Sequence, residues 1–283
     1  MDNLKTKLFL FSLVIFCQLS YAQSPWDTTK LGRNDRVGKY AKIRGFNMYY
    51  EIYGKGEPLL FIHGNGGSMN GFLFQLPYFA KHFKVIMADS RAQGKSLDHS
   101  DSLSYEMMAD DFNALLDHLK IDSCYVVGWS DGGINALLLA MRHPKKVKML
   151  ASTGANLWPD TTAIDPFVYK MIVHMNDSLS RLAATPEINN QRKLIRILAD
   201  EPHIKLSDLK KIHCPSLIIG GDHDVILPLH TLAIAQAIPK SYLWIIPNSG
   251  HSTPIVYKDE FNRSVMDFFT KPFRKIQGTE RFR

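Results

Sequence analysis

Short apolar runs recur along the chain, and segments with helical periodicity separate them. Six runs have the length and unbroken apolar character of strands buried on both faces, namely residues 58–63, 83–88, 124–129, 147–152, 215–220 and 242–246. Apolar residues recur at helical spacing in residues 105–119, 132–142, 229–238 and 256–269. This alternation predicts an α/β fold, with a mostly parallel sheet covered by helices on both faces.

Two further segments complete the predicted architecture. Residues 40–53 alternate around a turn at 44–47, which predicts an opening β-hairpin and brings the sheet to eight strands. Between about residues 157 and 209 helix-forming residues dominate and no strand is predicted, so this insertion is expected to form a small helical lid over the strand ends. No repeat or Gly/Ser-rich linker divides the chain after residue 39, and we expect a single domain over residues 40–270.

The first 22 residues differ from the rest. Lys5 and Lys7 precede an apolar run from Leu8 to Phe16, and small residues at 20–22 suit a cleavage site, which predicts a signal peptide over 1–22. The alternative is a membrane anchor, but the run is far shorter than the roughly 20 residues that span a bilayer. We therefore expect a secreted or periplasmic protein with no stable membrane insertion after cleavage, and a loosely ordered segment over residues 23–39.

Composition is that of an ordinary globular protein, with 45% hydrophobic and 22% charged residues. The formal net charge of +7 is concentrated at the end, because residues 271–283 hold five basic residues and one acidic residue. We interpret this basic tail as solvated and expect no nucleic-acid partner. Outside the leader the cysteines are Cys124 and Cys214, whose predicted strands are separated by a third strand. They should remain free thiols.

Residues 128–132 read G-W-S-D-G and match the pattern G-x-S-x-G. The predicted strand 124–129 leads into this motif and a predicted helix follows it, which is the strand-turn-helix context that the motif requires. Glycines two positions either side of Ser130 allow the tight turn, and the helix amides favour a developing negative charge. The alternative is a glycine-rich helix start with a capping serine. We interpret Ser130 as a nucleophile.

With two more motifs, the chain resembles the α/β-hydrolase superfamily. Residues 63–67, H-G-N-G-G, follow a predicted strand and resemble that family's oxyanion loop, while residues 89–96, D-S-R-A-Q-G-K-S, resemble its D-x-R-G-x-G-x-S turn. Ala92 replaces the usual first glycine of that turn. The resemblance implies an oxyanion hole formed by the backbone amides of Asp131 and Asn65. His63 is open to a catalytic interpretation, but in the family's pattern it is structural.

The resemblance also implies an acid and a base, in the chain order serine, acid, histidine. Residues 220–228 follow an apolar strand, and Asp224 lies four residues before Pro228, as the family's acid does. Asp222 is the competing carboxylate in the same loop. His251 lies in an N-S-G-H-S turn after the last strand and is the predicted base. A serine hydroxyl needs an imidazole to take its proton, and the imidazole needs a carboxylate to fix its tautomer.

The region from 127 to 158 is similar to a narrower group, the valacyclovirase-like hydrolases of amino acid esters. This similarity implies that Asp131 binds the α-ammonium of the substrate, although Asp131 could equally serve only to cap the following helix. Trp129 is a second candidate substrate-binding residue. The expected function is hydrolysis of small carboxylic esters through an acyl-enzyme, with a preference for a free amine.

Other functions remain open at this point. A peptidase or lactonase would use the same three residues, and a catalytically silent protein could use the cavity to bind a small ligand. No cofactor is expected, and no cluster of residues at zinc-ligand spacing predicts a metal site. The expected partner is a small-molecule ester, while the oligomeric state is undetermined by the sequence.

Overall fold

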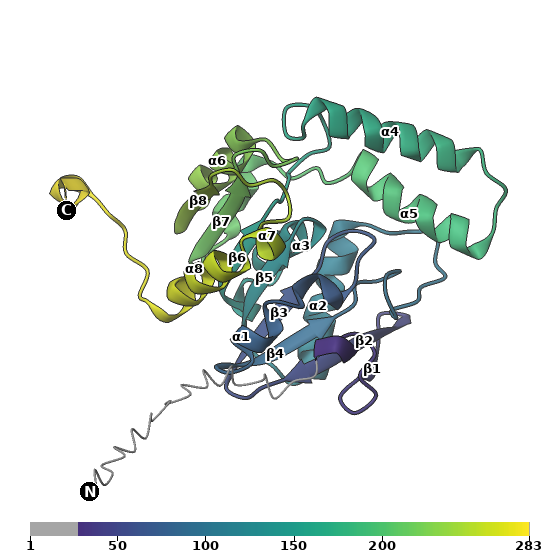
Figure 1. The fold of residues 1–283 in the computed structure, drawn as a ribbon, viewed down its shortest axis with the longest axis horizontal. Helices are drawn as coiled ribbons and strands as arrows, with labels where there is room; N and C mark the ends of the chain where they lie inside the picture. The colour runs from purple at the N-terminus through teal and green to yellow at the C-terminus, as the bar shows by residue number, and fades with distance from the viewer. Residues whose placement is uncertain (1–27, 283) are drawn as a thin grey trace, which may run out of the picture.

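The computed structural model describes residues 28–282, and the predicted signal peptide lies outside these residues. Eight strands form one sheet (Figure 1): β1 Lys39–Ile43, β2 Phe46–Tyr53, β3 Glu57–Ile62, β4 Phe83–Ala88, β5 Cys124–Trp129, β6 Val147–Thr153, β7 Ser216–Gly221 and β8 Ser241–Ile246. Their order across the sheet is β1-β2-β4-β3-β5-β6-β7-β8. Only the pairings of β2 with β1 and with β4 are antiparallel and the other five are parallel, so the predicted mostly parallel eight-stranded sheet is confirmed.

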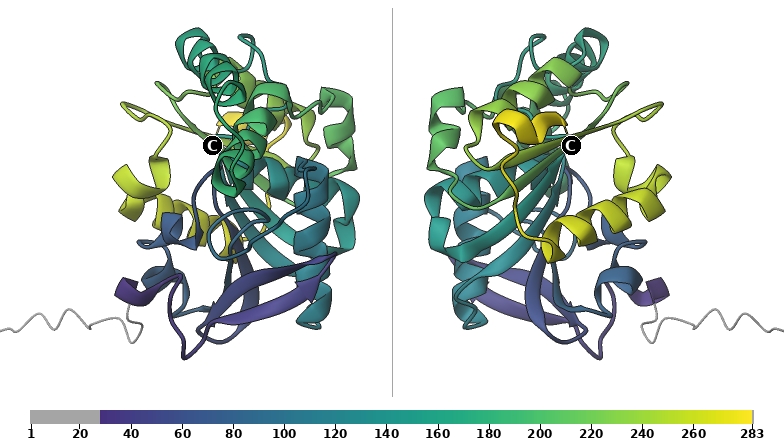
Figure 2. Two further views of the ribbon diagram at one scale, coloured as in Figure 1. Left: turned by 90° about the vertical axis from the view of Figure 1, so that its right-hand side faces the viewer. Right: turned by 90° about the vertical axis from the view of Figure 1, so that its left-hand side faces the viewer.

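Helices cover both faces of the sheet (Figure 2). One layer contains α2 Tyr105–His118, α3 Asp131–Arg142 and α6 Pro228–Ala237, and the other contains α1 Leu76–Phe79, α7 Thr253–Val256 and α8 Lys258–Thr270. Successive residues of β3 point to opposite faces of the sheet. Leu60 packs in the core beneath α2, α3 and α6, and Phe61 packs in the core beneath α1 and α8. Each such buried side chain stabilises the fold by about 1.5–3 kcal/mol relative to an exposed one.

Two helices lie side by side beyond the strand ends, in the segment where the lid is predicted (Figure 1). These are α4 Pro166–Ser180 and α5 Pro186–Asp200, and they pack against each other. Each begins with a capping side chain followed by proline: Asp165 accepts from the amides of α4, and Thr185 accepts from α5. Side chains of α5 donate hydrogen bonds to the loop 92–101, and α4 lies on the outer side of α5.

Two terminal segments lie outside the sheet and its layers. The part of the N-terminal segment that the structure describes is anchored rather than loosely held, because the carboxylate of Glu51 accepts hydrogen bonds from the amides of Gly32 and Asn34 at 3.1 and 3.0 Å. Leu31 is also buried.

The start of the basic tail contacts β8, because Phe273 stacks on Tyr242 with ring centroids 4.8 Å apart and the amide of Arg274 donates to the Tyr242 hydroxyl at 2.7 Å. Beyond these residues the tail runs away from the domain (Figure 1), and Phe282 is 92% exposed. Within residues 28–282, no helix combines the length and the apolar character needed to cross a membrane.

Candidate active site

Ser130 stands at a sharp turn between β5 and α3. Its backbone is strained, with φ 58° and ψ −122°, and its amide donates to the carbonyl of Thr153 at 2.8 Å. The flanking glycines are sterically required: a Cβ at Gly128 would lie 2.0 Å from the carbonyl oxygen of Gly132, and a Cβ at Gly132 would lie 1.8 Å from that of Ile62. The turn therefore holds the serine hydroxyl above the carboxyl ends of the strands.

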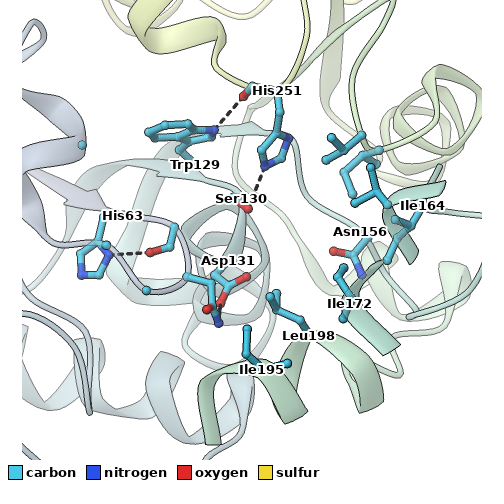
Figure 3. A pocket seen from close by; sticks show the side chains of 18 of the residues that line it. His63, Trp129, Ser130, Asp131, Asn156, Ile164, Ile172, Ile195, Leu198 and His251 are labelled. Atoms are coloured by element: carbon cyan, nitrogen blue, oxygen red, sulfur yellow. Dashed lines mark hydrogen bonds between the residues drawn. The ribbon is translucent and has the colours of Figure 1, made fainter. Parts of the chain in front are cut away.

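Three predicted residues from three loops, Ser130, Asp224 and His251, meet at this edge of the sheet, and Figure 3 shows Ser130 and His251. His251 Nε2 lies 2.9 Å from Ser130 Oγ, and His251 Nδ1 lies 2.6 Å from Asp224 Oδ1. A carboxylate only accepts hydrogen bonds, so Nδ1 carries the imidazole proton and Nε2 is free to accept the proton of the serine. This arrangement has the geometry of an activated nucleophile with an oriented base.

The two carboxylates of the 220–228 loop have separate environments. The side chain of Asp224 is fully buried, and the amides of Ile226 and Gly221 donate to it at 3.1 and 3.4 Å in addition to the imidazole. Asp222 instead contacts its neighbour His223 at 2.8 Å and accepts from the amide of Ser249. The hydrogen bond from His223 is the main cause that lowers the pKa of Asp222 to about 2. Asp224 is the carboxylate that reaches His251.

The predicted oxyanion loop lies directly against the nucleophile. A side chain at Gly64 would meet Ser130 Cβ at 3.1 Å, and both Asn65 and Asp131 line the cavity in front of the serine. Asp131 is the first residue of α3, so its backbone amide has no acceptor within the helix and is one of the free N–H groups at the helix N-terminus. The side-chain amide of Asn65 donates to Asp131 Oδ2 and to the carbonyl of Leu194 in α5, both at 2.9 Å.

Asp131 is 2% exposed, and its carboxylate already accepts two hydrogen bonds. Besides Asn65, the hydroxyl of Tyr105 donates to Oδ1 at 2.8 Å. Burial raises the pKa of Asp131 to about 6, although both hydrogen bonds and the charge of His251 oppose the shift. Tyr105 was predicted from the sequence only as the start of a helix, because nothing in its local pattern indicates a partner 26 residues away.

A cavity of about 600 Å³ opens in front of Ser130, which is an ordinary size for a small-molecule site. Its far wall is apolar and comes from the lid and the loops beneath it, with Ile172, Ile195 and Leu198 facing the serine in Figure 3. Two carboxylates, Asp131 and Glu201, line the cavity, and no lysine or arginine is among its described lining residues. The cavity therefore suits an uncharged or cationic ligand with an apolar part.

Two other predicted residues have backbone partners. His63 is 2% exposed; its Nδ1 lies 2.8 Å from the carbonyl of Gly64, and its Nε2 accepts from the amide of Ser90. These bonds tie the oxyanion loop to the turn after β4, as a structural histidine would. Trp129 lines the cavity, but its indole N–H already donates to the carbonyl of His251. Across residues 28–282, no group of three or more metal-ligating side chains is present.

Comparisons with known proteins agree with this fold. Residues 57–173 match the protein family described as alpha/beta hydrolase fold. The serine hydrolase BPHL of Mus musculus is 26% identical over 260 residues, covering 80% of this chain and 84% of its own. The 2-hydroxy-6-oxononadienedioate/2-hydroxy-6-oxononatrienedioate hydrolase 1 of Pseudomonas putida is 27% identical over 285 residues, covering 83% and 97%. The solved structure of Est816, an N-acyl homoserine lactone degrading enzyme, matches with a TM-score of 0.68 and 24% identity, covering 81% and 100%.

The chain has the α/β-hydrolase fold, and the family match together with these relatives supports its place in the α/β-hydrolase superfamily. The two curated relatives named above, each matched over about four fifths of this chain, are hydrolases, which supports hydrolase activity for this chain. The resemblance based on residues 63–67, 89–96 and 128–132 is thereby confirmed. The likeness to Est816, at 24% identity, shows the fold alone.

Proposed function

We propose that this protein is a serine hydrolase that cleaves carboxylic esters through an acyl-enzyme, with Ser130 as nucleophile, His251 as base and Asp224 as the residue that orients it. The observation that carries the proposal is the continuous hydrogen-bonded path from Ser130 Oγ through the imidazole to Asp224, at 2.9 and 2.6 Å. A general base must lie within such reach of the proton that it abstracts.

The proposed reaction has two halves. In the first, Ser130 Oγ bonds to the ester carbonyl carbon while its proton passes to His251 Nε2, and the carbonyl oxygen becomes an oxyanion that accepts from the amides of Asp131 and Asn65. The bond from that carbon to the alkoxy oxygen then breaks, and the imidazolium protonates the leaving alcohol. In the second half, water attacks the acyl-serine with the same base, which releases the acid and regenerates Ser130.

The test is labelling with a fluorophosphonate combined with turnover of p-nitrophenyl esters. Wild-type protein should be labelled once and should hydrolyse acetate and butyrate esters, whereas Ser130→Ala should lose both properties. The matched control is Ser102→Ala, which removes an exposed serine that does not line the cavity. Folded wild-type protein that neither labels nor turns over any ester would favour the silent binding protein, while cleavage of amides or lactones with labelling at Ser130 would favour the peptidase or lactonase.

A preference for esters with a free amine is the finer part of the proposal. It is supported by the buried Asp131 carboxylate beside the nucleophile and by the lack of lysine or arginine among the described residues of the cavity wall. A charge-assisted hydrogen bond between this carboxylate and an ammonium is worth about 1.5–3 kcal/mol. The dioate substrate in the name of the Pseudomonas relative would bring two negative charges to these carboxylates, which disfavours that class here.

Asp131→Asn tests this preference. We expect kcat/KM for an aminoacyl ester to fall roughly 10- to 100-fold, the equivalent of that hydrogen bond, and kcat/KM for a neutral ester of the same size to change by less than about threefold. Glu187→Gln, at an exposed position at the start of α5, is the matched control. Equal losses on both esters would mean that Asp131 acts only through its contacts with Asn65 and Tyr105.

We further propose that residues 1–22 direct export and are removed, so that the working enzyme is secreted or periplasmic and meets a small-molecule ester there. The support is the pattern of Lys5 and Lys7, a short apolar run and small residues at 20–22. Expression of the full chain followed by N-terminal sequencing should give mature protein that begins at Gln23. Protein that retains Met1 in the cytoplasmic fraction would refute the proposal.

A further inference from the structure

Trp129 connects the nucleophile to the loop that carries the histidine (Figure 3). It is the last residue of β5 and directly precedes Ser130, and its indole Nε1–H donates to the backbone carbonyl of His251 at 2.8 Å. The two rings lie close, with centroids 6.3 Å apart. The same strand end therefore supplies the serine hydroxyl and a hydrogen bond to the main chain of the histidine.

The main chain of His251 lies in a loop, and the bond from Trp129 holds it in place. His251 lies between the end of β8, an edge strand of the sheet, and the start of α7, so no strand or helix holds its own main chain. Hydrogen bonds from the 222–223 loop reach the backbone of Ser249 but not that of His251. Both ring nitrogens of His251 are engaged with Ser130 and Asp224, and the side chain is still 24% exposed.

The indole itself is rigidly held. Phe72 packs edge-on against it with ring centroids 6.4 Å apart, and the backbone at Gly71 approaches so closely that a Cβ there would lie 3.4 Å from Cζ3. Trp129 is also paired across the sheet with Thr153 of β6. A donor fixed by strand pairing and ring packing can hold the carbonyl of His251 at a constant distance from the nucleophile.

We propose that Trp129 is a positioning residue, which sets the distance between the imidazole and Ser130 by fixing the main chain of His251. This inference rests on the proposed function, since it assigns a role within the same reaction. Proton transfer is sensitive to such placement, and a displacement of about 1 Å can lower a rate about 100-fold. With its N–H engaged, Trp129 has no hydrogen-bond donor to offer a substrate, so loss of this hydrogen bond should lower kcat and change KM little.

The experiment removes the donor and keeps an aromatic side chain at position 129. Trp129→Phe, and replacement of Trp129 by β-3-benzothienylalanine, which has the shape of tryptophan with sulfur in place of N–H, should each lower kcat for a p-nitrophenyl ester roughly 10- to 100-fold with KM within about threefold. Fluorophosphonate labelling of Ser130 should slow by the same factor. Trp158→Phe is the matched control, because its indole donates to Thr162 Oγ1 at 2.7 Å outside the cavity, and it should leave kcat unchanged.

A second measurement separates this inference from the proposed function. Exchange of the His251 Nδ1 proton with water, followed by NMR, reports the order of the histidine loop without any turnover, and it should be faster in both Trp129 variants than in the wild type. A kcat within twofold of the wild type, a change in KM alone, or an unchanged exchange rate would overturn the inference. Failure of the proposed function would appear differently, as unlabelled Ser130 in the wild-type protein.

Discussion

Among single residues, Asp131 is a buried carboxylate whose ionised form loses favourable hydration in the folded protein. Its carboxylate is buried between Asn65 and Tyr105, and burial raises its pKa from the ordinary 3.8 to about 6. No lysine or arginine forms an ion pair with it among residues 28–282. At neutral pH the protein thus keeps an ionised carboxylate out of water beside its nucleophile, where a cationic ligand would compensate for the lost hydration.

This burial predicts a dependence of stability on pH. Because the pKa is raised in the folded state, the folded protein binds the proton of Asp131 more tightly than the unfolded chain, so the contribution of Asp131 to stability is present below about pH 4 and is lost as the pH rises to about 6. A shift of about two pKa units corresponds to about 3 kcal/mol. Urea unfolding at pH 4 and pH 7 should show wild-type stability falling by about this amount relative to Asp131→Asn. The exposed Asp177→Asn is measured as a control, and a pH-independent difference for Asp131→Asn would contradict the prediction.

The turn at Ser130 leaves no space for a side chain at Gly132. A methyl group at this position would lie 1.8 Å from the carbonyl oxygen of Ile62, well inside van der Waals contact, and the neighbouring backbone has little room to move. We expect Gly132→Ala to destabilise the protein by more than about 3 kcal/mol, measured by urea unfolding, and to abolish fluorophosphonate labelling. Gly250→Ala meets its nearest atom only at 3.7 Å and should be tolerated.

At the scale of elements, α5 is the fixed half of the lid. Its side chains donate to backbone carbonyls of the loop 92–101: Asn190 to Ala92, Lys193 to Asp98 and Ser100, and Arg196 to Asp101. A fifth bond links α5 to the oxyanion loop, because the side-chain amide of Asn65 donates to the carbonyl of Leu194. The helix α4 packs mainly on α5 and exposes apolar side chains, including Phe167 at 77%. The cavity wall thus depends on how firmly α5 is attached.

Lys193 is the residue through which this attachment can be tested. It is 8% exposed, and its ammonium donates to two carbonyls at 3.0 and 2.7 Å, so Lys193→Met should remove about 2–3 kcal/mol of stability. Amide exchange measured by mass spectrometry should rise in residues 186–200 more than in the sheet. The exposed Lys170→Met, on α4, is the control. Exchange in α5 equal to that of the wild type would show that the helix is held by other contacts.

At the scale of the whole molecule, the sheet separates the two described cysteines. Cys124 lies on β5 and Cys214 precedes β7, with β6 between them, and both thiols are free as predicted. Burial raises the pKa of Cys124 to about 12 and that of Cys214 to about 11, so neither is an accessible thiolate at neutral pH. Iodoacetamide should modify the native mature protein slowly and add two alkyl groups after unfolding in urea. Rapid modification, or a mass that indicates a disulfide, would contradict this.

The elements themselves were predictable because their signals are local. The strands at 83–88 and 124–129 have the predicted bounds and the other predicted apolar strands differ by one residue at one or both ends, since continuous apolar runs between turns mark strands buried on both faces. The last predicted helix, residues 256–269, divides into α7 and α8 at Tyr257, a break that helical periodicity does not reveal. The anchoring of residues 28–38 was also missed, because it depends on Glu51 in a distant strand.

The sequence by itself determined the elements and the loops in which Ser130, Asp224 and His251 lie, because each motif follows a strand and the parallel strands end at one edge of the sheet. Only the tertiary structure decided which side chains meet there. The bond from Trp129 to His251 spans 122 residues, and the bond from Asn65 to Leu194 spans 129. Such contacts depend on strand register and on how the lid packs, and periodicity carries no information about either.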